Sequence, residues 1–215
     1  FWFNWCIKNI MKFTKKQIDR YSRQIILKKI GVTGQKKLLG SKVLIVGAGG
    51  LGSPIAIYLA ALGIGKIGIV DKDKVEISNL SRQVLFNTND VNKSKSIATA
   101  TKLRKINPDI KIKYFNKKLI KKNINKIAKN FDLIVDGSDN FRTRFLINDY
   151  CLKNKKILVS GAINKFDGQI YTFNFLKKKS PCLRCFIPVA PMDPDLDNCE
   201  NEGVLGTLGG IIGSI

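Results

Sequence analysis

The stretch Lys42–Gly52, KVLIVGAGGLG, decides the fold. Its first half, Lys42–Val46, is a run of aliphatic residues that suits a strand buried on both faces of a parallel sheet. Gly47, Gly49 and Gly52 then complete a G-x-G-x-x-G pattern. In such a turn the first glycine permits a tight bend, the second lets the backbone approach a phosphate, and the third lets helix and strand pack closely.

The residues after this turn extend the pattern into a nucleotide-binding unit. Ser53–Leu62 predicts an amphipathic helix whose N-terminus offers free N–H groups and partial positive charge to an anion. The next strand, Lys66–Val70, ends at Asp71, nineteen residues past Gly52, where such folds place a carboxylate on a ribose. The order of elements predicts an adenine-nucleotide cradle, but it does not distinguish NAD, FAD and ATP.

The rest of the chain continues the alternation of strands and helices. Further helices are predicted over Lys16–Ile30, Thr33–Leu39, Asn92–Ile106, Lys121–Lys129 and Phe141–Lys153, and further strands over Ile110–Phe115, Phe131–Asp136, Ile157–Ser160 and Gly168–Phe175. This order predicts an α/β, Rossmann-like, doubly wound and mostly parallel sheet, with an N-terminal helical segment and a C-terminal antiparallel extension.

The 215 residues predict one domain. We expect helices over 20–40, a nucleotide-binding core over 41–161, and an antiparallel extension over 162–215 that is incomplete at its C-terminal end. The last segment, Gly203–Ile215, reads as the start of a helix. Phe1–Ile10 is aromatic, lacks the features of a signal peptide, and precedes Met11, so we expect it to lie outside the native chain; a peripheral anchor is the alternative.

Composition excludes several classes of protein. The chain has no histidine, which removes Ser-His-Asp and Cys-His catalysis and imidazole acid–base chemistry. The formal net charge is +22, yet lysine is spread along the whole chain, and this argues against a nucleic-acid interface, which would cluster its charges. No apolar stretch is long enough to span a membrane. The five cysteines follow no secretory signal, which favours the cytoplasm.

Two further groups of residues carry possible chemistry. Strand Phe131–Asp136 ends in DGSDN, so Asp136, Asp139 and Asn140 are expected at the carboxyl edge of the sheet, where ligands bind. Cys182 and Cys185 form a C-x-x-C pair, which is half of a tetrathiolate zinc site; a redox pair is the alternative.

By these motifs the sequence resembles the ThiF/MoeB/HesA family, the adenylating enzymes of ubiquitin-like sulfur carriers that are related to ubiquitin-activating E1. The stretches that carry the resemblance are RYSRQIIL (Arg20–Leu27), VLIVGAGGLGSP (Val43–Pro54), GIVDKDKVEISNLSRQ (Gly68–Gln83), INPDI (Ile106–Ile110), DGSDNFRTR (Asp136–Arg144), VSGA (Val159–Ala162), GQIYTF (Gly168–Phe173) and PCLRC (Pro181–Cys185). NLSRQ, DN and PCxxC in this order are far more specific than the glycines.

The resemblance implies ATP-dependent adenylylation of a carrier's C-terminal glycine carboxylate, for molybdopterin or thiamin biosynthesis. The partner is then a small MoaD- or ThiS-like protein with a Gly-Gly tail. The reaction suits a chain without histidine, because a carboxylate is already ionised and needs no general base. What it requires is positive charge placed on the triphosphate.

The resemblance also assigns roles to residues. Arg82 and Lys95 would contact the phosphates, and Asn79 would hydrogen-bond to them. Gln83 would support the loop, Asp71 would bind the ribose, and Asp139 would hold Mg²⁺. Arg20 would reach the γ-phosphate of the partner subunit's ATP, which implies a homodimer. The predicted ATP-binding set is Gly47, Gly49, Gly50, Gly52, Asp71, Asn79, Arg82, Gln83, Lys95, Asp139 and Asn140. Surface charges at Arg82 and Lys95 and a helix cap at Asp139 are the alternatives.

Relatives supply a second C-x-x-C further along, so Zn²⁺ is expected only if the full-length chain contributes two more cysteines, and we interpret this chain as C-terminally truncated. Cys199 matches the position that accepts the acyl group or forms a sulfur linkage in the thiamin branch. Acidic neighbours (Asp197, Glu200 and Glu202) should raise the pKa of that thiol, which weakens a reactive role.

Three other classes stay open at this point. The glycines and Asp71 would also suit an NAD-dependent oxidoreductase, although the missing acid–base residue counts against it. A tRNA-modifying relative would suit the basic charge. A truncated, non-catalytic nucleotide-binding module is the third.

Overall fold

The computed structural model describes residues 13–189 and 203–215. The predictions for Phe1–Ile10 and Cys199 concern residues outside these ranges. Within them, no helix combines the length and the apolar character that crossing a membrane requires.

A six-stranded sheet forms the centre of the molecule, in the order β3-β2-β1-β4-β5-β6. Its strands are β1 (Lys42–Val46), β2 (Lys66–Val70), β3 (Lys111–Phe115), β4 (Leu133–Asp136), β5 (Ile157–Asn164) and β6 (Asp167–Asn174). The first five pair in parallel, and β6 pairs antiparallel to β5. This is the strand order of a doubly wound nucleotide-binding fold, and it confirms the predicted fold class, including the antiparallel extension.

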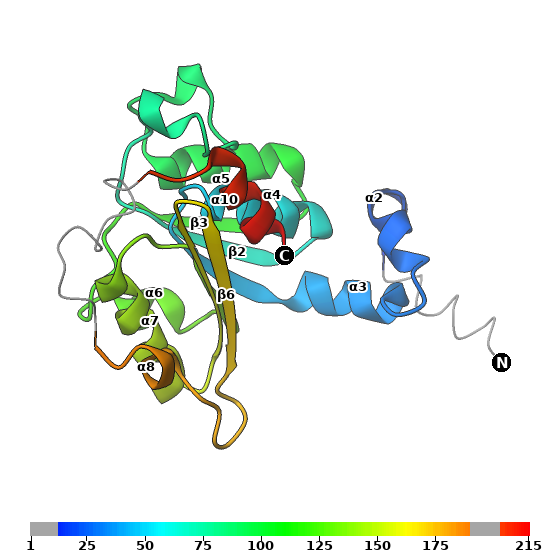
Figure 1. The fold of residues 1–215 in the computed structure, drawn as a ribbon. Helices are drawn as coiled ribbons and strands as arrows, with labels where there is room; N and C mark the ends of the chain where they lie inside the picture. Colours follow the sequence, from blue (N-terminus) through cyan, green and yellow to red (C-terminus); the bar gives the residue numbers. More distant parts are fainter. Residues whose placement is uncertain (1–12, 190–202) are drawn as a thin grey trace.

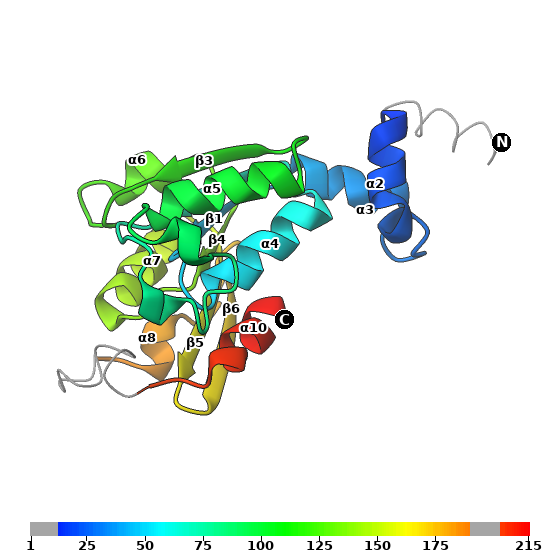
Figure 2. The same cartoon turned by 90° about the horizontal axis from the view of Figure 1, so that it is seen from above.

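Helices cover both faces of this sheet (Figures 1 and 2). One face carries α4 (Gly52–Leu62), α5 (Lys95–Ile106) and α10 (Gly206–Ser214), and the other carries α6 (Ile124–Ala128), α7 (Phe141–Lys153) and α8 (Leu183–Phe186). Short 3₁₀ turns lie at Ile77–Asn79 and Thr88–Asp90. The N-terminal helices α2 (Lys15–Ile25) and α3 (Gly31–Gly40) project to one side of the body, and α3 leads directly into β1.

The side chains of β1 point alternately to the two faces of the sheet and so contribute to two separate apolar clusters. Val43 and Ile45 pack on one face, in a cluster with residues of α4 and α5, whereas Leu44 and Val46 pack on the other face with residues of α6 and α7. All four are buried. A strand with both faces covered is apolar at successive positions, which is why Val43–Val46 forms a continuous aliphatic run after the exposed Lys42.

Several predicted boundaries were wrong, and each has a local reason. The first helix ends at Ile25 rather than Ile30, and Ile26 and Leu27 are 68% and 52% exposed, so their apolar pattern is not a buried helix face. Gly31 (φ +58°) begins α3 instead of only ending the previous helix.

Other elements differ in length. Helix α5 starts at Lys95, three residues later than predicted, because Asn92 takes a positive φ of 68° and Ser94 bridges to Lys74. Helix α6 is shorter than Lys121–Lys129, and β5 runs on to Asn164 because it pairs along its whole length with β6. Helix α7 has the predicted bounds.

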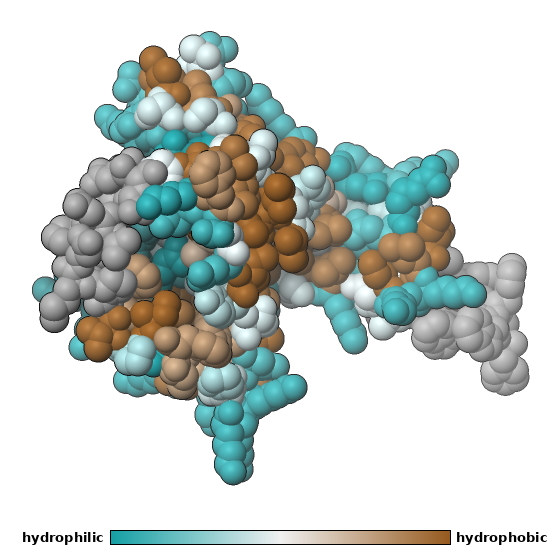
Figure 3. All heavy atoms as spheres, in the orientation of Figure 1, coloured by the Kyte–Doolittle hydropathy of each residue, from teal (hydrophilic) through white to brown (hydrophobic). Residues whose placement is uncertain are grey.

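Apolar side chains gather at the centre of the face drawn in Figure 3, in the region of α10. Leu205, Ile211 and Ile215, which lie in α10 or directly next to it in the chain, are exposed. Hydrophilic side chains lie on either side of this region, as expected for a chain so rich in lysine.

Candidate functional site

The glycine turn connects β1 to α4 at the carboxyl edge of the sheet. Gly47 has φ +90°, and a Cβ atom there would lie 2.7 Å from the carbonyl oxygen of Gly137. A Cβ atom at Gly52 would lie 2.0 Å from the carbonyl oxygen of Gly47. Both positions therefore require glycine, the first for its backbone conformation and the second for the close approach of helix to strand.

A pocket opens where this turn meets the end of β4, the point at which the strand order reverses. Ligands of doubly wound sheets bind at this point. The predicted nucleotide residues that line the pocket are Gly47, Gly49, Gly50, Asp71, Arg82, Gln83, Lys95, Asp139 and Asn140. Of the remaining predicted site residues, Gly52, Asn79, Arg20, Cys182 and Cys185 do not line it.

Asp71 is held against the glycine turn. Its Oδ2 accepts a hydrogen bond from the backbone N–H of Ala48 at 2.8 Å, and its Oδ1 accepts one from the N–H of Asp73 at 2.7 Å. Burial raises the pKa of this carboxyl above its usual range, although these two hydrogen bonds and the positive charge of Lys95 oppose the shift. The carboxylate is thus fixed in orientation and partly desolvated.

Two predicted cations reach the pocket from different elements. Lys95 is the first residue of α5, is 7% exposed, and its backbone N–H donates to Asp73 O at 2.8 Å. Arg82 comes from the loop after β2, and its Nη1 donates to Ser78 O at 3.2 Å. The stem of Arg82 lies beside Gly50, because a Cβ atom at Gly50 would be 3.7 Å from Arg82 Cγ.

Asp139 and Asn140 divide two tasks at the end of β4. Asn140 is the N-cap of α7, with its Oδ1 accepting from the Thr143 N–H at 2.9 Å. Asn140 also donates from Nδ2 to Asp139 Oδ1 at 3.0 Å. Asp139 is exposed to the pocket. The helix cap weighed as an alternative for Asp139 is thus supplied by Asn140, which leaves the Asp139 carboxylate available to a ligand.

Asp136, the other acid of the DGSDN motif, is fully buried and satisfied. Its Oδ1 accepts from the N–H and the hydroxyl of Ser138, and its Oδ2 accepts from the Ser160 hydroxyl at 2.9 Å. It ties β4 to β5 and shapes the turn before Asp139.

The loop between β2 and α5 is organised by Asn79. The Asn79 side chain is buried, and its Oδ1 accepts a hydrogen bond from the Glu76 N–H at 3.2 Å. The backbone carbonyl of Asn79 accepts from the N–H groups of Arg82 and Gln83 at 3.1 and 2.9 Å. Asn79 therefore holds the loop from behind and does not face the pocket. Gln83 does face it: it is 3% exposed, and its Oε1 has no hydrogen-bond partner among the described residues.

Three cations at the pocket were not predicted. Arg144 is buried and its Nη2 donates to Ser138 O at 2.7 Å, so it holds the turn that carries Asp139. Lys117 and Lys118 line the pocket from the segment after β3. The position of that segment, directly beyond the carboxyl end of a parallel strand, was the signal that could have found these lysines.

Cys182 and Cys185 lie apart from the pocket, and α7 holds them in place. Their sulfur atoms are 3.8 Å apart, and the Cys182 N–H donates to the Cys185 sulfur at 3.4 Å. Asn148 of α7 accepts from the Leu183 N–H through Oδ1 at 2.8 Å. Arg184 makes two hydrogen bonds of 2.8 Å to the Asp149 carboxylate.

The spacing of the two sulfurs fits a shared metal. With Zn–S bonds of about 2.3 Å and tetrahedral angles, two thiolates on one zinc lie about 3.8 Å apart. A disulfide would bring the sulfurs to about 2.0 Å. No group of three or more metal-ligating side chains occurs within 13–189 and 203–215, so this pair supplies two ligands at most from that part of the chain.

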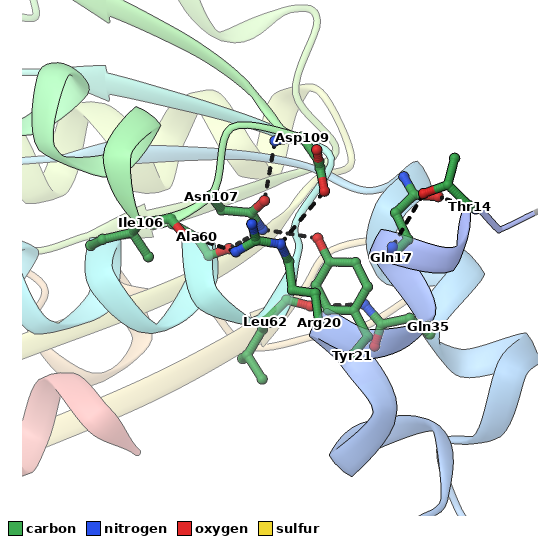
Figure 4. A network of polar contacts seen from close by, with 10 residues as sticks. All are labelled: Thr14, Gln17, Arg20, Tyr21, Gln35, Ala60, Leu62, Ile106, Asn107 and Asp109. Atoms are coloured by element: carbon green, nitrogen blue, oxygen red, sulfur yellow. Dashed lines mark hydrogen bonds and ion pairs between the residues drawn. The ribbon is translucent and has the colours of Figure 1, made fainter.

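Arg20 lies at the opposite, amino edge of the sheet (Figure 4). Its Nη1 donates to Ile106 O at 3.0 Å, and its Nε lies 3.5 Å from Asp109 Oδ2. Beside it, the hydroxyl of fully buried Tyr21 accepts from Asn107 Nδ2 at 2.9 Å. Within this chain, then, Arg20 is part of a structural network and does not line the pocket.

The sequence and the fold are similar to those of known proteins. Residues 21–215 match the ThiF family. The sulfur carrier protein adenylyltransferase of Thermus thermophilus is 42% identical over 95% of this chain and 77% of its own length. The probable molybdopterin-synthase adenylyltransferase of Porphyra purpurea is 46% identical over 94% of this chain, which spans about half (53%) of that relative. The SAMP-activating enzyme E1 of Haloferax volcanii is 45% identical, over 93% and 73%.

Solved structures share the fold. A crystal structure of E. coli MccB superposes with a TM-score of 0.78 at 24% identity, over 91% of this chain and 61% of that one. E. coli TcdA, a tRNA N6-threonylcarbamoyladenosine dehydratase solved in complex with ATP, superposes with a TM-score of 0.67 at 26% identity, over 70% and 62%.

Proposed function

This chain belongs to the ThiF family, and we propose that it adenylylates the C-terminal glycine carboxylate of a small ubiquitin-like sulfur carrier protein. The observation that carries the proposal is the convergence of Arg82, Lys95 and Asp139 on one pocket beside the glycine turn. Relatives named as adenylyltransferases of sulfur carriers and of molybdopterin synthase support it. The pathway is molybdopterin or thiamin biosynthesis.

The reaction matches the residues available. A carboxylate oxygen of the carrier attacks the α-phosphorus of ATP, the bond to the β-phosphate oxygen breaks, and an acyl-adenylate and pyrophosphate result. No proton is transferred, so the absence of histidine is no obstacle. The obstacle is repulsion between anions, which Arg82, Lys95 and the N-terminus of α4 would offset. Asp71 would accept the ribose hydroxyls.

Mg²⁺ fits this pocket as part of the proposal. Asp139 is an exposed carboxylate beside the expected phosphates, and Mg²⁺ is held in proteins by one or two carboxylates together with substrate phosphates and water. When bound, the ion neutralises phosphate charge. Asp139 would hold it, oriented by its hydrogen bond from Asn140.

The homodimer is also part of the proposal, and it rests on the place of Arg20. Because Arg20 lies at the edge of the sheet opposite its own pocket, it could serve only the pocket of another subunit. Helix α2, which carries it, projects from the body (Figure 2) and is suited to reach a second copy.

Zinc at Cys182 and Cys185 fits the sulfur spacing, with two further ligands required from elsewhere. Zinc content measured on the natural full-length protein and on its Cys182→Ser variant tests this assignment. Cys151, Cys182 and Cys185 form no disulfide with one another in the part of the chain that the structure describes, which suits a reducing compartment such as the cytoplasm.

ATP–pyrophosphate exchange tests the proposed function. We expect exchange to require Mg-ATP and a MoaD- or ThiS-like carrier, and to disappear when the carrier lacks its last glycine. The carrier that supports exchange identifies the pathway. Binding of NADH without any affinity for ATP would overturn the proposal. Exchange or ATP turnover that depends on tRNA instead of a carrier would assign the chain to the reaction class of TcdA.

A further inference from the structure

The C-terminal helix α10 packs against the glycine turn through its own glycines. A Cβ atom at Gly209 would lie 2.8 Å from the carbonyl oxygen of Gly50, and one at Gly213 would lie 2.9 Å from that of Leu51. Real Cβ atoms essentially never come within 3.0 Å of such an atom. The neighbouring Gly210, by contrast, has no atom of the described residues within 4 Å of its Cβ position. Backbone therefore touches backbone on one face of α10 only.

The same face reaches the loop that carries Arg82. A Cβ atom at Gly206 would lie 2.7 Å from Ser81 O and 3.8 Å from Arg82 Cβ. The stem of Arg82 thus has Gly50 on one side and Gly206 close by. Val204, just before the helix, lines the pocket itself.

The start of α10 is fixed independently of these contacts. The Leu205 N–H donates to Lys165 O at 2.9 Å, and the Lys165 N–H donates to Gly203 O at 3.2 Å. The turn between β5 and β6 therefore holds the residues just before α10 in place, and this fixes the position from which α10 packs against the glycine turn.

The loop beside these contacts also forms part of the pocket wall. Gln83 is 3% exposed and lines the pocket. Its Nε2 would be 3.7 Å from a Cβ atom at Gly49, so a shift of the loop changes the distance between this side chain and the glycine turn.

We propose that Gly206 and Gly209 are positioning residues of the nucleotide site. They let the backbone of α10 set the position of the Gly50 carbonyl and of the loop that carries Arg82 and Gln83. This inference rests on the proposed function, because it concerns the same pocket. The distances leave no room for a methyl group, so any side chain there displaces the turn or the loop by several tenths of an ångström.

A matched pair of variants tests the role of Gly209. Alanine favours a helix over glycine at both Gly209 and Gly210, so the two variants gain alike in helix propensity and differ in the contact with Gly50. By calorimetric titration of Mg-ATP, we expect Gly209→Ala to weaken binding by about tenfold, since small misplacements of binding groups have effects of this size or larger. Gly210→Ala should bind as the wild type does.

A double-mutant cycle tests Gly206 separately and applies even if Gly209→Ala fails to fold. If Gly206 acts through Arg82, Gly206→Ala weakens ATP binding several-fold in the wild-type background and has little further effect in Arg82→Ala. A merely structural role would give equal effects in both backgrounds and would overturn the inference for Gly206.

The outcomes separate the two proposals. A wild-type chain that does not bind Mg-ATP refutes the proposed function. Wild-type binding with equal affinities for Gly209→Ala and Gly210→Ala, or additive effects of Gly206→Ala and Arg82→Ala, refutes the positioning role alone.

Discussion

The two edges of the sheet use the same kinds of side chain differently. At the carboxyl edge, Arg82, Lys95 and Asp139 point into a pocket. At the amino edge, Arg20 and Asp109 are engaged with each other and with the backbone (Figure 4). One edge keeps its charged groups available to a ligand, and the other uses them to fasten α2 to the body.

This difference extends to other arginines of the chain. Arg184 pairs with the Asp149 carboxylate, and Arg144 holds the turn before Asp139. Whether a guanidinium binds a ligand depends on the edge of the sheet at which it lies and on what already accepts its hydrogen bonds.

The largest effect is expected from Asp139→Ala at the carboxyl edge. Losing the carboxylate proposed to hold Mg²⁺ should lower pyrophosphate exchange about a hundredfold, or ~3 kcal/mol of transition-state stabilisation. The thermal midpoint should hardly change, because Asp139 is exposed and Asn140 caps the helix. Asp167→Ala, at an exposed acid in β6, is the control and should keep full exchange. An Asp139→Ala variant with normal exchange would show that another group holds the metal.

The next largest effect is expected from Arg20→Ala, because in a dimer Arg20 at the amino edge of one subunit would contact ATP at the carboxyl edge of the other. If Arg20 contacts the triphosphate of the partner subunit, Arg20→Ala should lower exchange about thirtyfold, near ~2 kcal/mol, as expected for a charged hydrogen bond. Asp109→Ala, which removes only the ion pair within the subunit, is the matched control and should stay close to wild type.

Mixing subunits decides whether Arg20 acts in trans. A heterodimer of Arg20→Ala and Asp139→Ala subunits would contain one site with both residues intact, so mixing should restore exchange once mass spectrometry shows that heterodimers form. If mixing restores no exchange, Arg20 does not contribute to the partner's site, and its only role is in the structural network at the amino edge of its own subunit.

A smaller effect, on stability alone, is expected from Asn107→Ala. Asn107 is fully buried, and its Nδ2 donates to both Tyr21 Oη and Ala60 O, at 2.9 and 2.8 Å. Removing it should lower the free energy of unfolding by about 1–2 kcal/mol, measured by urea denaturation. The Kd for Mg-ATP should not change. A weaker Kd would mean that the amino edge influences the pocket.

The smallest effect is a pH dependence that belongs to the carboxyl edge. Burial raises the pKa of Asp71 in the folded protein, so folded protein binds a proton there more readily than unfolded protein does. The free energy of unfolding therefore falls as the pH rises from the unfolded-state pKa of this carboxyl through its folded-state pKa. The ionised form is the one that accepts ribose hydroxyls. Affinity for Mg-ATP should therefore decline several-fold between about pH 7 and about pH 4.5. Asp71→Asn should bind more weakly and lose this part of the pH dependence; an identical profile in both proteins would remove Asp71 from the site.

Local sequence was sufficient for the elements whose residues contact their near neighbours. The bounds of α7 and the β1–α4 turn were predictable because a helix cap and a glycine turn act over a few residues. The end of α2 was not predictable, because the apolar pattern of the sequence continues to Ile26, whereas the helix ends at Ile25 and Ile26 is exposed. The length of β5 was not either, since its last four residues gain their hydrogen bonds from β6.

For the candidate site, the sequence pattern placed the glycine turn, Asp71 and Asp139 after strand ends, which converge at one edge of a parallel sheet. Arg82 and Lys95 were predicted from the resemblance to the ThiF family, since neither follows a strand directly. Only the tertiary structure assigned the helix cap to Asn140 and placed Asn79 behind the pocket wall. It alone brought Gly209 onto Gly50 of the glycine turn, 159 residues earlier in the chain, and Gly206 onto Ser81, 125 residues earlier. Periodicity and turn signals report short-range preferences, whereas the partner of a buried polar group or of a close-packed glycine is fixed by the packing of distant elements.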